Sequence, residues 1–214
     1  IAEISGGNPF FALELARALP DDQAGPEQPL PATLTDLVRR RIAALDDAER
    51  ALLLSVACVA EPTIELLAKA NDVDADELAR RVQRAEAAGI LGLDGHRVRF
   101  THPLLAGGVY TDAGPAARRA MHRALAALET QPELRARHLA LASAHGDEEI
   151  LTALDQAADS ARFRGAPAAA AELVDLALRL GGDTVLRRMK SAENHFLAGN
   201  TARAGALLAD AATM

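Results

Sequence analysis

An internal repeat with a period of 34 follows Pro103, and this repeat most restricts the folds open to the chain. A shift of 34 positions aligns small or apolar residues in five pairs: Ala158 with Ala192, Gly165 with Gly199, Ala168 with Ala202, Leu173 with Leu207 and Ala177 with Ala211. Between the glycines, apolar residues recur at helical spacing. The pattern predicts pairs of short helices, each of which buries an apolar face against the next pair.

A 34-residue period is typical of tetratricopeptide (TPR) repeats. We therefore predict a TPR-like helical array over residues 115–214, with helices at about 115–129, 132–145, 147–164, 167–180, 184–198 and 201–212. Because only one full copy and its successor are visible, the alternative is a chance match in an alanine-rich sequence. Composition favours helices in either case, since 50% of the residues are hydrophobic, 3% are aromatic and none is tryptophan. Alanine and leucine form helices readily, so the expected fold class is all-α.

Residues 46–114 combine three expected helices, the one clear strand pattern of the chain and a further expected helix at about 104–111. Asp46 and Glu49 form a capping-box pattern at the start of the first helix. The second is expected at 63–70, and Asp74 is expected to cap the third. Residues 90–100 then alternate apolar and polar side chains around Asp94-Gly95, a strong signal for a β-hairpin. Three helices followed by a small hairpin is the order of a winged-helix domain.

Residues 1–45 are expected to be helical on either side of a proline-rich linker. Asn8 is a good N-cap, and Pro9 stands at the first helical position, where its missing N–H costs nothing. Residues 20–33 hold several prolines and acids but few large apolar side chains, which predicts a linker. A further helix is expected at 35–45. The chain begins at Ile1, and we expect it to be an internal fragment of a longer protein.

The net charge of -7 argues against a basic face that binds duplex DNA. Two basic clusters, Arg39–Arg41 and the group Arg80, Arg81 and Arg84, are open to a DNA-binding interpretation, but acidic neighbours favour solvated helix faces. No stretch approaches the ~20 apolar residues of a membrane span, and no signal peptide is visible. We therefore expect a cytoplasmic segment without direct contacts to membrane or nucleic acid.

No motif in the chain predicts catalysis. Its two lysines, Lys69 and Lys190, do not follow a glycine-rich loop, so the chain holds no P-loop. Cys58 lies in an apolar run and is expected to be a buried structural thiol. The six histidines lack metal-ligand spacing. His138 and His145, seven apart on one expected helix, are interpreted as surface or packing residues. We expect neither an enzyme nor a metal site.

Several segments occur in an order that resembles a known family. They are Gly7–Phe11 before a helix, Leu30–Val38, and Arg99–Leu105 just after the hairpin. Arg137–Ala140 and the alanine-rich helices ending at Arg164–Ala166 are similar to the helical region that follows in that family. Together they resemble the large ATP-binding transcriptional regulators of the LuxR type, members of the STAND class of signal-transducing ATPases. The likeness covers nearly the whole chain.

The resemblance implies that this chain is the middle of a series of domains. A P-loop domain would precede it, a LuxR-type DNA-binding domain would follow it, and ATP or ADP would bind to the parent protein. This segment alone would bind nucleotide weakly or not at all, because the P-loop lies outside it.

The resemblance also implies two nucleotide contacts. Pro9, in the family's Gly-x-Pro motif, would pack near the adenine. His102, at the histidine of the Met-His-Asp motif, would contact the β-phosphate of ADP, since an imidazole can donate to a phosphate oxygen. Thr101 and Pro103 stand where the family has Met and Asp, which puts the role of that acid in doubt.

Three functional hypotheses follow. The first is a regulatory segment that couples the ADP or ATP state, through a winged-helix latch, to helical repeats that bind a protein or small-molecule effector. The second is a helical-repeat interaction module with a purely structural winged helix, in which Asn8-Pro9 only starts a helix and His102 is a turn or core histidine. The third is a DNA-binding winged helix.

Overall fold

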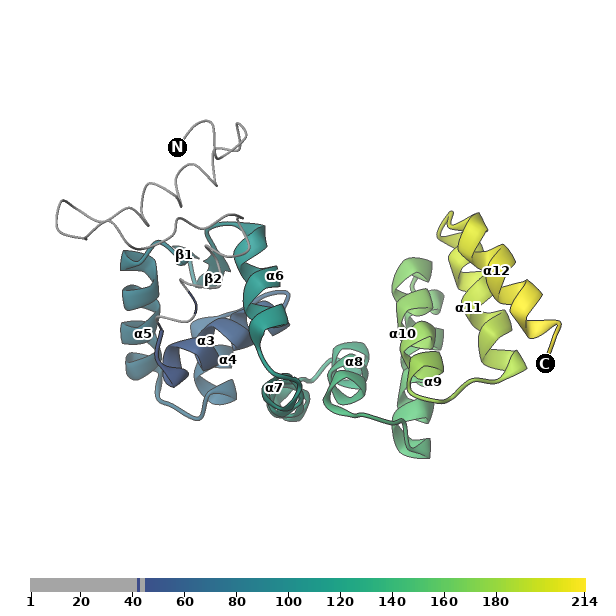
Figure 1. Ribbon diagram of the computed structural model, residues 1–214, viewed down its shortest axis with the longest axis horizontal. Helices are drawn as coiled ribbons and strands as arrows, with labels where there is room; N and C mark the ends of the chain where they lie inside the picture. Colours follow the sequence, from purple (N-terminus) through teal and green to yellow (C-terminus); the bar gives the residue numbers. More distant parts are fainter. Residues whose placement is uncertain (1–41, 43–44) are drawn as a thin grey trace, which may run out of the picture. The chain divides into compact units, whose positions relative to one another are not determined.

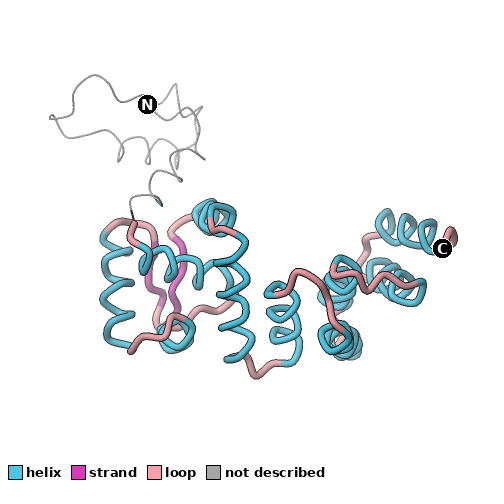
Figure 2. Tube along the Cα trace, turned by 60° about the horizontal axis from the view of Figure 1, so that its bottom comes forward, coloured by secondary structure: helices cyan, strands magenta, loops and turns pink. Residues whose placement is uncertain are grey.

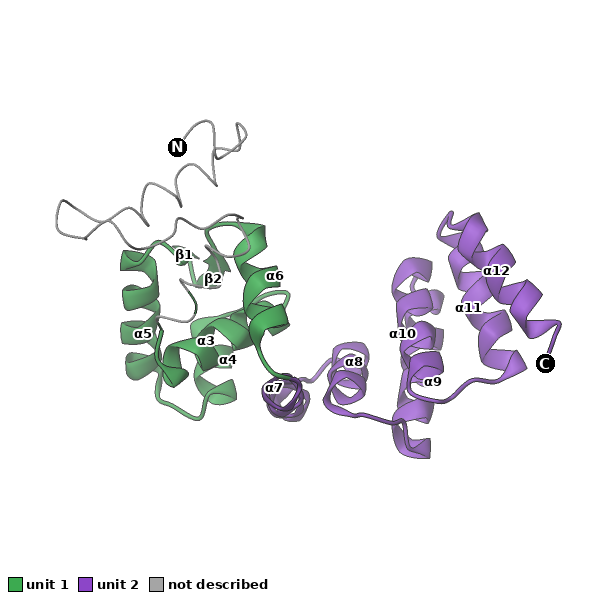
Figure 3. Ribbon diagram, in the orientation of Figure 1, with its two compact units in different colours: residues 1–114 green, residues 115–214 purple. Residues whose placement is uncertain are grey.

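The computed structural model describes residues 42 and 45–214. The predictions for Pro9, the first helix, the linker 20–33 and most of the helix at 35–45 lie outside the described residues. The chain divides into two compact units, residues 1–114 and 115–214 (Figure 3). In the described part, ten helices and one two-stranded antiparallel hairpin are present. This confirms the expected mostly helical fold with a small hairpin.

The described part of unit 1 contains four helices and the hairpin. Along the chain these are α3 (Asp47–Cys58), α4 (Ile64–Ala70), α5 (Ala75–Ala87), β1 (Leu91–Asp94), β2 (Arg97–Phe100) and α6 (Pro103–Asp112) (Figure 1). Figure 2 shows the hairpin in magenta among the helices of this unit. An isolated bridge joins Thr63 to Arg97, and the Val98 N–H donates to the Pro62 carbonyl at 2.8 Å. The segment between α3 and α4 therefore lies against β2.

Local hydrogen bonds start the first helices of unit 1 where the sequence predicts. The Glu49 N–H donates to Asp46 Oδ1 at 2.7 Å, and the Asp46 N–H donates to Glu49 Oε2 at 3.2 Å, which completes the capping box. Asp74 accepts from the Glu77 N–H at 2.7 Å. Each carboxylate satisfies a backbone donor that has no partner within its own helix.

The hairpin forms at the predicted residues, but its turn lies one position later. Asp94 still pairs with Arg97, so the loop residues are Gly95 and His96 rather than Asp94 and Gly95. Gly95 has φ +63°. A left-handed residue at the first loop position suits a two-residue hairpin turn, and glycine adopts it at no steric cost.

Every described helix and strand of unit 1 contributes to its core. Buried side chains come from α3 to α6 and from both strands: Leu52, Leu53, Leu67, Leu78, Val82, Leu91, Val98 and Leu105. Cys58 is only half-buried, so the prediction of a buried thiol is wrong. Because α3 ends at this residue, its side chain lies at the margin of the core.

Unit 2 consists of six helices. They are α7 (Pro115–Leu128), α8 (Pro132–Ala142), α9 (Glu148–Phe163), α10 (Pro167–Arg179), α11 (Val185–Leu197) and α12 (Thr201–Ala211). Only α8 has an end that differs from the predicted one by more than one position. It ends early because Ser143 is extended, with φ -109° and ψ 148°, and the Gly146 N–H donates to the Leu180 carbonyl of the α10 C-cap.

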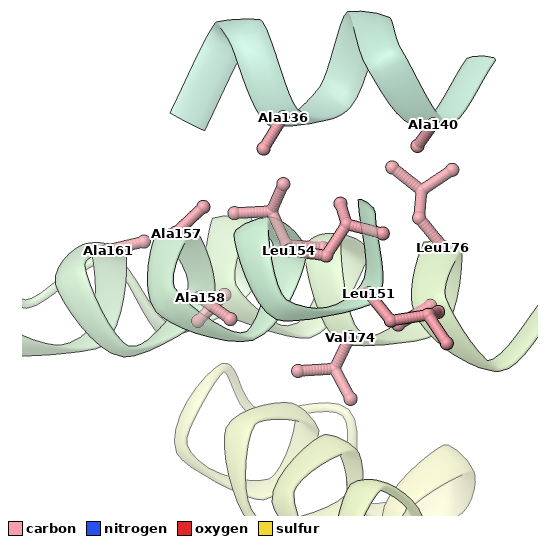
Figure 4. Close-up of a cluster of buried hydrophobic side chains, with 12 residues drawn as sticks. Ala136, Ala140, Leu151, Leu154, Ala157, Ala158, Ala161, Val174 and Leu176 are labelled. Carbon is pink, nitrogen blue, oxygen red and sulfur yellow. The ribbon is translucent and has the colours of Figure 1, made fainter. Parts of the chain in front are cut away.

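Helices α8, α9 and α10 share one apolar core. Figure 4 shows Ala136 and Ala140 of α8 facing leucines of the neighbouring helices. The buried members of this cluster are Ala136, Ala140, Leu151, Leu154, Ala157, Ala158, Ala161, Ala170, Leu173, Val174, Leu176 and Ala177. More than half of them are alanine, which lets the helix axes approach closely.

The 34-residue period recurs in the backbone geometry of α9 and α11. Gly165 and Gly199 follow these helices with φ +78° and +84°. The Gly165 N–H donates to the Arg162 carbonyl, and one repeat period later the Gly199 N–H donates to the Phe196 carbonyl. Each helix end also has a second hydrogen bond at the same place. The Ala166 N–H donates to the Ala161 carbonyl, and the Asn200 N–H donates to the His195 carbonyl. Both helices therefore end in the same Schellman-type turn, which requires a left-handed residue at the glycine.

Candidate functional site

His102 lies between β2 and α6 and caps the helix. Its Nδ1 accepts a hydrogen bond from the Leu104 N–H at 3.2 Å, and its carbonyl accepts from the Leu105 N–H at 3.0 Å. Pro103 occupies the first helical position, where it needs no hydrogen-bond acceptor. The ring is half-buried. The helix start therefore fixes the orientation of the imidazole.

The capping bond also determines which nitrogen carries the proton. A nitrogen that accepts from a backbone N–H cannot itself be protonated, so the proton of the neutral ring lies on Nε2. The side chain thus combines an Nδ1 acceptor for the helix with an Nε2–H donor.

Thr101 connects the end of β2 to the turn after α5. Its Oγ1 donates to the Gly89 carbonyl at 2.8 Å, and its backbone N–H donates to the Ile90 carbonyl at 3.0 Å. Thr101 therefore has a structural role at the position where the resembled family has methionine. Pro9, the other predicted site residue, lies outside the described residues.

The arginines of α5 are paired with carboxylates. Arg80 and Arg81 both bind Glu77, at 2.9 and 2.7 Å, and Arg84 binds Glu49 of α3 at 3.2 Å. Hydrogen bonds from Arg81 and then Arg80 hold the pKa of Glu77 below its usual value. The helix contains as many acids as arginines, so these side chains do not form a uniformly basic face.

We expect this chain to bind duplex DNA no more tightly than a neutral protein binds it. In a mobility-shift assay at about 50 mM salt, no shifted band should form up to roughly 10 μM protein, because phosphate neutralisation supplies non-specific affinity. A shifted complex that weakens steeply with added salt would support a DNA-binding winged helix instead.

Two buried histidines are in contact between α7 and α8, and no spacing in the sequence predicts this contact. Nδ1 of His122 and Nδ1 of His138 are 2.9 Å apart, and the side chains are 2% and 6% exposed. Desolvation, followed by the charges of His138, Arg137 and Arg118, lowers the pKa of His122 to about 4. Desolvation, followed by the charge of Arg137, also lowers the pKa of His138. His145 lies beyond the end of α8, so the expectation that it shares a helix with His138 is wrong.

A second polar cluster lies between α10 and α11. Asp175 accepts from Ser191 Oγ at 2.6 Å and lies 3.2 Å from His195 Nε2. Nearby on α11, Asn194 is 3% exposed, and its buried side-chain oxygen has no hydrogen-bond partner. The carboxylate bridges the hydroxyl and the imidazole, so His195 is not placed between Ser191 and Asp175 as a base that activates the serine would be.

Ion pairs connect α9 to α11. Arg187 binds Asp155 at 2.8 Å, Lys190 binds Asp159 at 3.0 Å, and Arg162 of α9 binds Glu193 of α11. Arg187 also donates to the Gly182 carbonyl at 3.0 Å. The partners lie 31 or 32 residues apart along the chain. They hold α9 and α11 together.

Neither a metal site nor a membrane span is found in the described part of the chain. No group of three or more histidine, cysteine, aspartate or glutamate side chains there could hold a metal ion. None of the helices in residues 45–214 is both long and apolar enough to cross a bilayer.

In comparisons with known proteins, the chain matches no protein family, no curated protein and no solved structure.

Proposed function

We propose that this chain is the internal regulatory segment of a nucleotide-switched transcriptional regulator of the LuxR type. Unit 1 would be a winged helix that senses bound ADP or ATP, and unit 2 would be a TPR-like platform for a protein or small-molecule effector. The P-loop domain would lie upstream and the DNA-binding domain downstream in the same chain. This segment would have no catalytic activity and would act in the cytoplasm.

The order of elements in unit 1 supports the winged-helix part of the proposal. The described elements follow the order α3, a bridge residue at Thr63, α4, α5, β1 and β2, and this order is compatible with a winged helix in which a short first strand joins the hairpin. The matching helix ends at Gly165 and Gly199 support the TPR-like part. They repeat at the 34-residue period that such arrays have.

The observation that carries the nucleotide hypothesis is the cap that His102 makes on α6. Nδ1 of His102 accepts from the Leu104 N–H, which holds the imidazole at the start of α6, and an imidazole N–H can donate to a phosphate oxygen of ADP. When bound, the nucleotide would supply a charged group whose contact with His102 favours one arrangement of the domains. Lys69 and Lys190 both lie within helices, so the main phosphate cradle would be outside this chain.

His102→Asn in the full-length parent protein tests this role. Asparagine retains an N-cap acceptor but lacks the imidazole donor, so the fold should persist while ADP dissociates faster. We expect roughly 10- to 100-fold faster release, the range of a lost charge-assisted hydrogen bond. Stopped-flow measurement with a fluorescent ADP analogue gives the rate.

His102→Ala is the matched control for stability. It removes both the cap and the donor, so it should lower the free energy of unfolding by about 0.5–2 kcal/mol relative to His102→Asn. Equal ADP release from wild type and His102→Asn would contradict the latch. Tight ADP binding by residues 1–214 alone would also contradict it, because the assignment places the P-loop elsewhere.

The second hypothesis, a helical-repeat interaction module with a structural winged helix, is favoured by one observation. The hydrogen bonds of His102 and Thr101 hold α6 and the hairpin in place. This structural role explains both residues without a bound nucleotide. Under this hypothesis His102→Asn leaves nucleotide exchange and activity unchanged.

A further inference from the structure

The first helix pair of unit 2 carries three arginines on one side. Arg119 and Arg123 are four positions apart on α7, so their side chains leave this helix on the same side. The short connection to α8 makes the two helices antiparallel, and they touch at His122 and His138. Arg135 of α8 lies about 60° round its helix from His138, in the same sense as Arg119 from His122. In an antiparallel pair this places all three arginines on one side, and we call Arg119, Arg123 and Arg135 the basic face.

The positive charge of the basic face is not neutralised within the described part of the chain. Residues 115–142 hold five arginines and two glutamates, in a chain whose net charge is -7. Glu133 binds Arg164 of α9, and Arg137, which points away from the basic face, binds Glu172 of α10. The three side chains of the basic face form no ion pair and no hydrogen bond with any described residue. Two of them are exposed and one is half-buried, so the guanidinium groups are available to a partner.

The equivalent face of the next helix pair is buried. The last residues of α7 and α9, Leu128 and Phe163, are 35 positions apart, and so are the prolines that begin α8 and α10, Pro132 and Pro167. This spacing is one position longer than that between the ends of α9 and α11. A shift of 35 takes the basic face to three side chains in the core shared by α8, α9 and α10: Leu154, Ala158 and Ala170. This side of a helix pair therefore packs against a further helix within the array.

We propose that the basic face binds an acidic helix of a partner protein. This partner is the protein effector proposed above for unit 2, so the inference rests on that role and names the chemistry of the effector. The position of the basic face favours a helix as its occupant, because the next pair buries the same positions beside α8. Its charge excludes an apolar helix, since burial of unpaired guanidinium groups costs more than the apolar contact returns.

Carboxylates on a partner helix match the spacing of the basic face. Arg119 and Arg123 are about 6 Å apart along the axis of α7, so two acids four positions apart on an adjacent helix can reach both. The planar fork of arginine can bind both oxygens of a carboxylate. The array already joins helices in this way, as Arg162 of α9 binds Glu193 of α11. A nucleic acid fits less well, because the remaining surface of a chain with net charge -7 repels a phosphate backbone.

Binding of a labelled acidic peptide to the 214-residue chain tests the inference. The probe is a capped helical peptide of about 16 alanine and glutamate residues, with glutamates four positions apart. At about 20 mM salt, fluorescence anisotropy should give a dissociation constant on the order of 100 μM. Binding should weaken about 10-fold or more at roughly 200 mM salt, because salt screens exposed ion pairs. The triple variant Arg119→Gln, Arg123→Gln and Arg135→Gln should also weaken binding by about 10-fold or more.

The matched control is the triple variant Arg99→Gln, Arg179→Gln and Arg203→Gln. These exposed arginines lie on β2, α10 and α12, and the control changes the net charge by the same amount. It should therefore bind the peptide as the wild type does. Equal weakening by the two triple variants would show that only net charge matters and would overturn the inference. Circular dichroism should confirm an unchanged helix content in both.

Two further outcomes would overturn the inference. One is a wild-type chain that does not bind the peptide at about 20 mM salt. The other is a single-stranded oligonucleotide of equal charge that binds through the basic face more tightly than the peptide, which would make the partner a nucleic acid. The ADP measurements on the His102 variants concern unit 1, so a failure of peptide binding is distinct from a failure of the nucleotide switch.

Discussion

Lowering the pH from 7 toward 4 should destabilise unit 2 by about 3 kcal/mol through His122 alone. An unfolded histidine has a pKa of about 6.5, whereas burial beside His138 lowers the folded pKa of His122 to about 4. Below pH 6.5 the unfolded chain binds a proton that the folded chain excludes, so stability falls as the pH falls. Each unit of pKa difference corresponds to about 1.4 kcal/mol. Urea unfolding followed by circular dichroism at several pH values measures the loss.

The main physical reason is burial, which disfavours a charge on either ring, and the hydrogen bond between the two rings adds to it. With Nδ1 atoms 2.9 Å apart, one ring must donate and the other must accept. Protonation of the acceptor makes both nitrogens donors and places a charge in a site that is almost fully closed to solvent. Arg137 and Arg118 oppose that charge further. The full stability is present above pH 6.5 and is lost progressively toward pH 4.

A variant without either histidine separates this effect from the titration of carboxylates. His122→Gln with His138→Gln should be less stable than wild type at pH 7 but should show a flatter pH dependence between 6.5 and 4. His145→Gln is the matched control, since His145 is exposed, and its pH profile should match that of wild type. A double variant with the wild-type slope would show that other groups cause the acid sensitivity.

Gly182→Ala should destabilise unit 2 by about 1–3 kcal/mol, the range for a side chain forced into a packed site. A Cβ at this position would lie 2.6 Å from Leu151 Cδ2 and 2.9 Å from both the Ala177 carbonyl and Arg187 Nη1. The Ala177 carbonyl accepts from the Gly182 N–H, so it cannot move without losing that bond. Leu151 belongs to the core of α8–α10, and its displacement would disturb that cluster.

Thermal unfolding compares this variant with Gly205→Ala. Gly205 lies within α12, and a Cβ there would have no neighbour within 4 Å. Alanine in an exposed helix interior favours the helix, so this control should raise stability by roughly 0.5–1 kcal/mol. Equal stability of Gly182→Ala and wild type would mean that the turn between α10 and α11 relaxes freely.

Most of the helices could be predicted because the signals that begin and end them lie within a few residues. Asp46 and Asp74 cap α3 and α5 through backbone groups three positions away. Gly165 and Gly199 end α9 and α11 because they adopt positive φ. The hairpin could be predicted because apolar and polar residues alternate on both sides of a glycine-containing turn. Where such a prediction was wrong, as at the end of α8, a distant contact from Gly146 to Leu180 decided the boundary.

The side-chain contacts between helices depended on how the helices pack. His122 and His138 are 16 residues apart on separate helices, and the ion pairs of α9 and α11 join residues 31 or 32 apart. No local spacing in the sequence predicts these contacts, because they arise from the angle and distance at which two helices cross. His102 is an intermediate case. The resemblance to the Met-His-Asp motif singled it out as a candidate in the sequence, whereas only the backbone of α6 shows that its Nδ1 accepts from the Leu104 N–H.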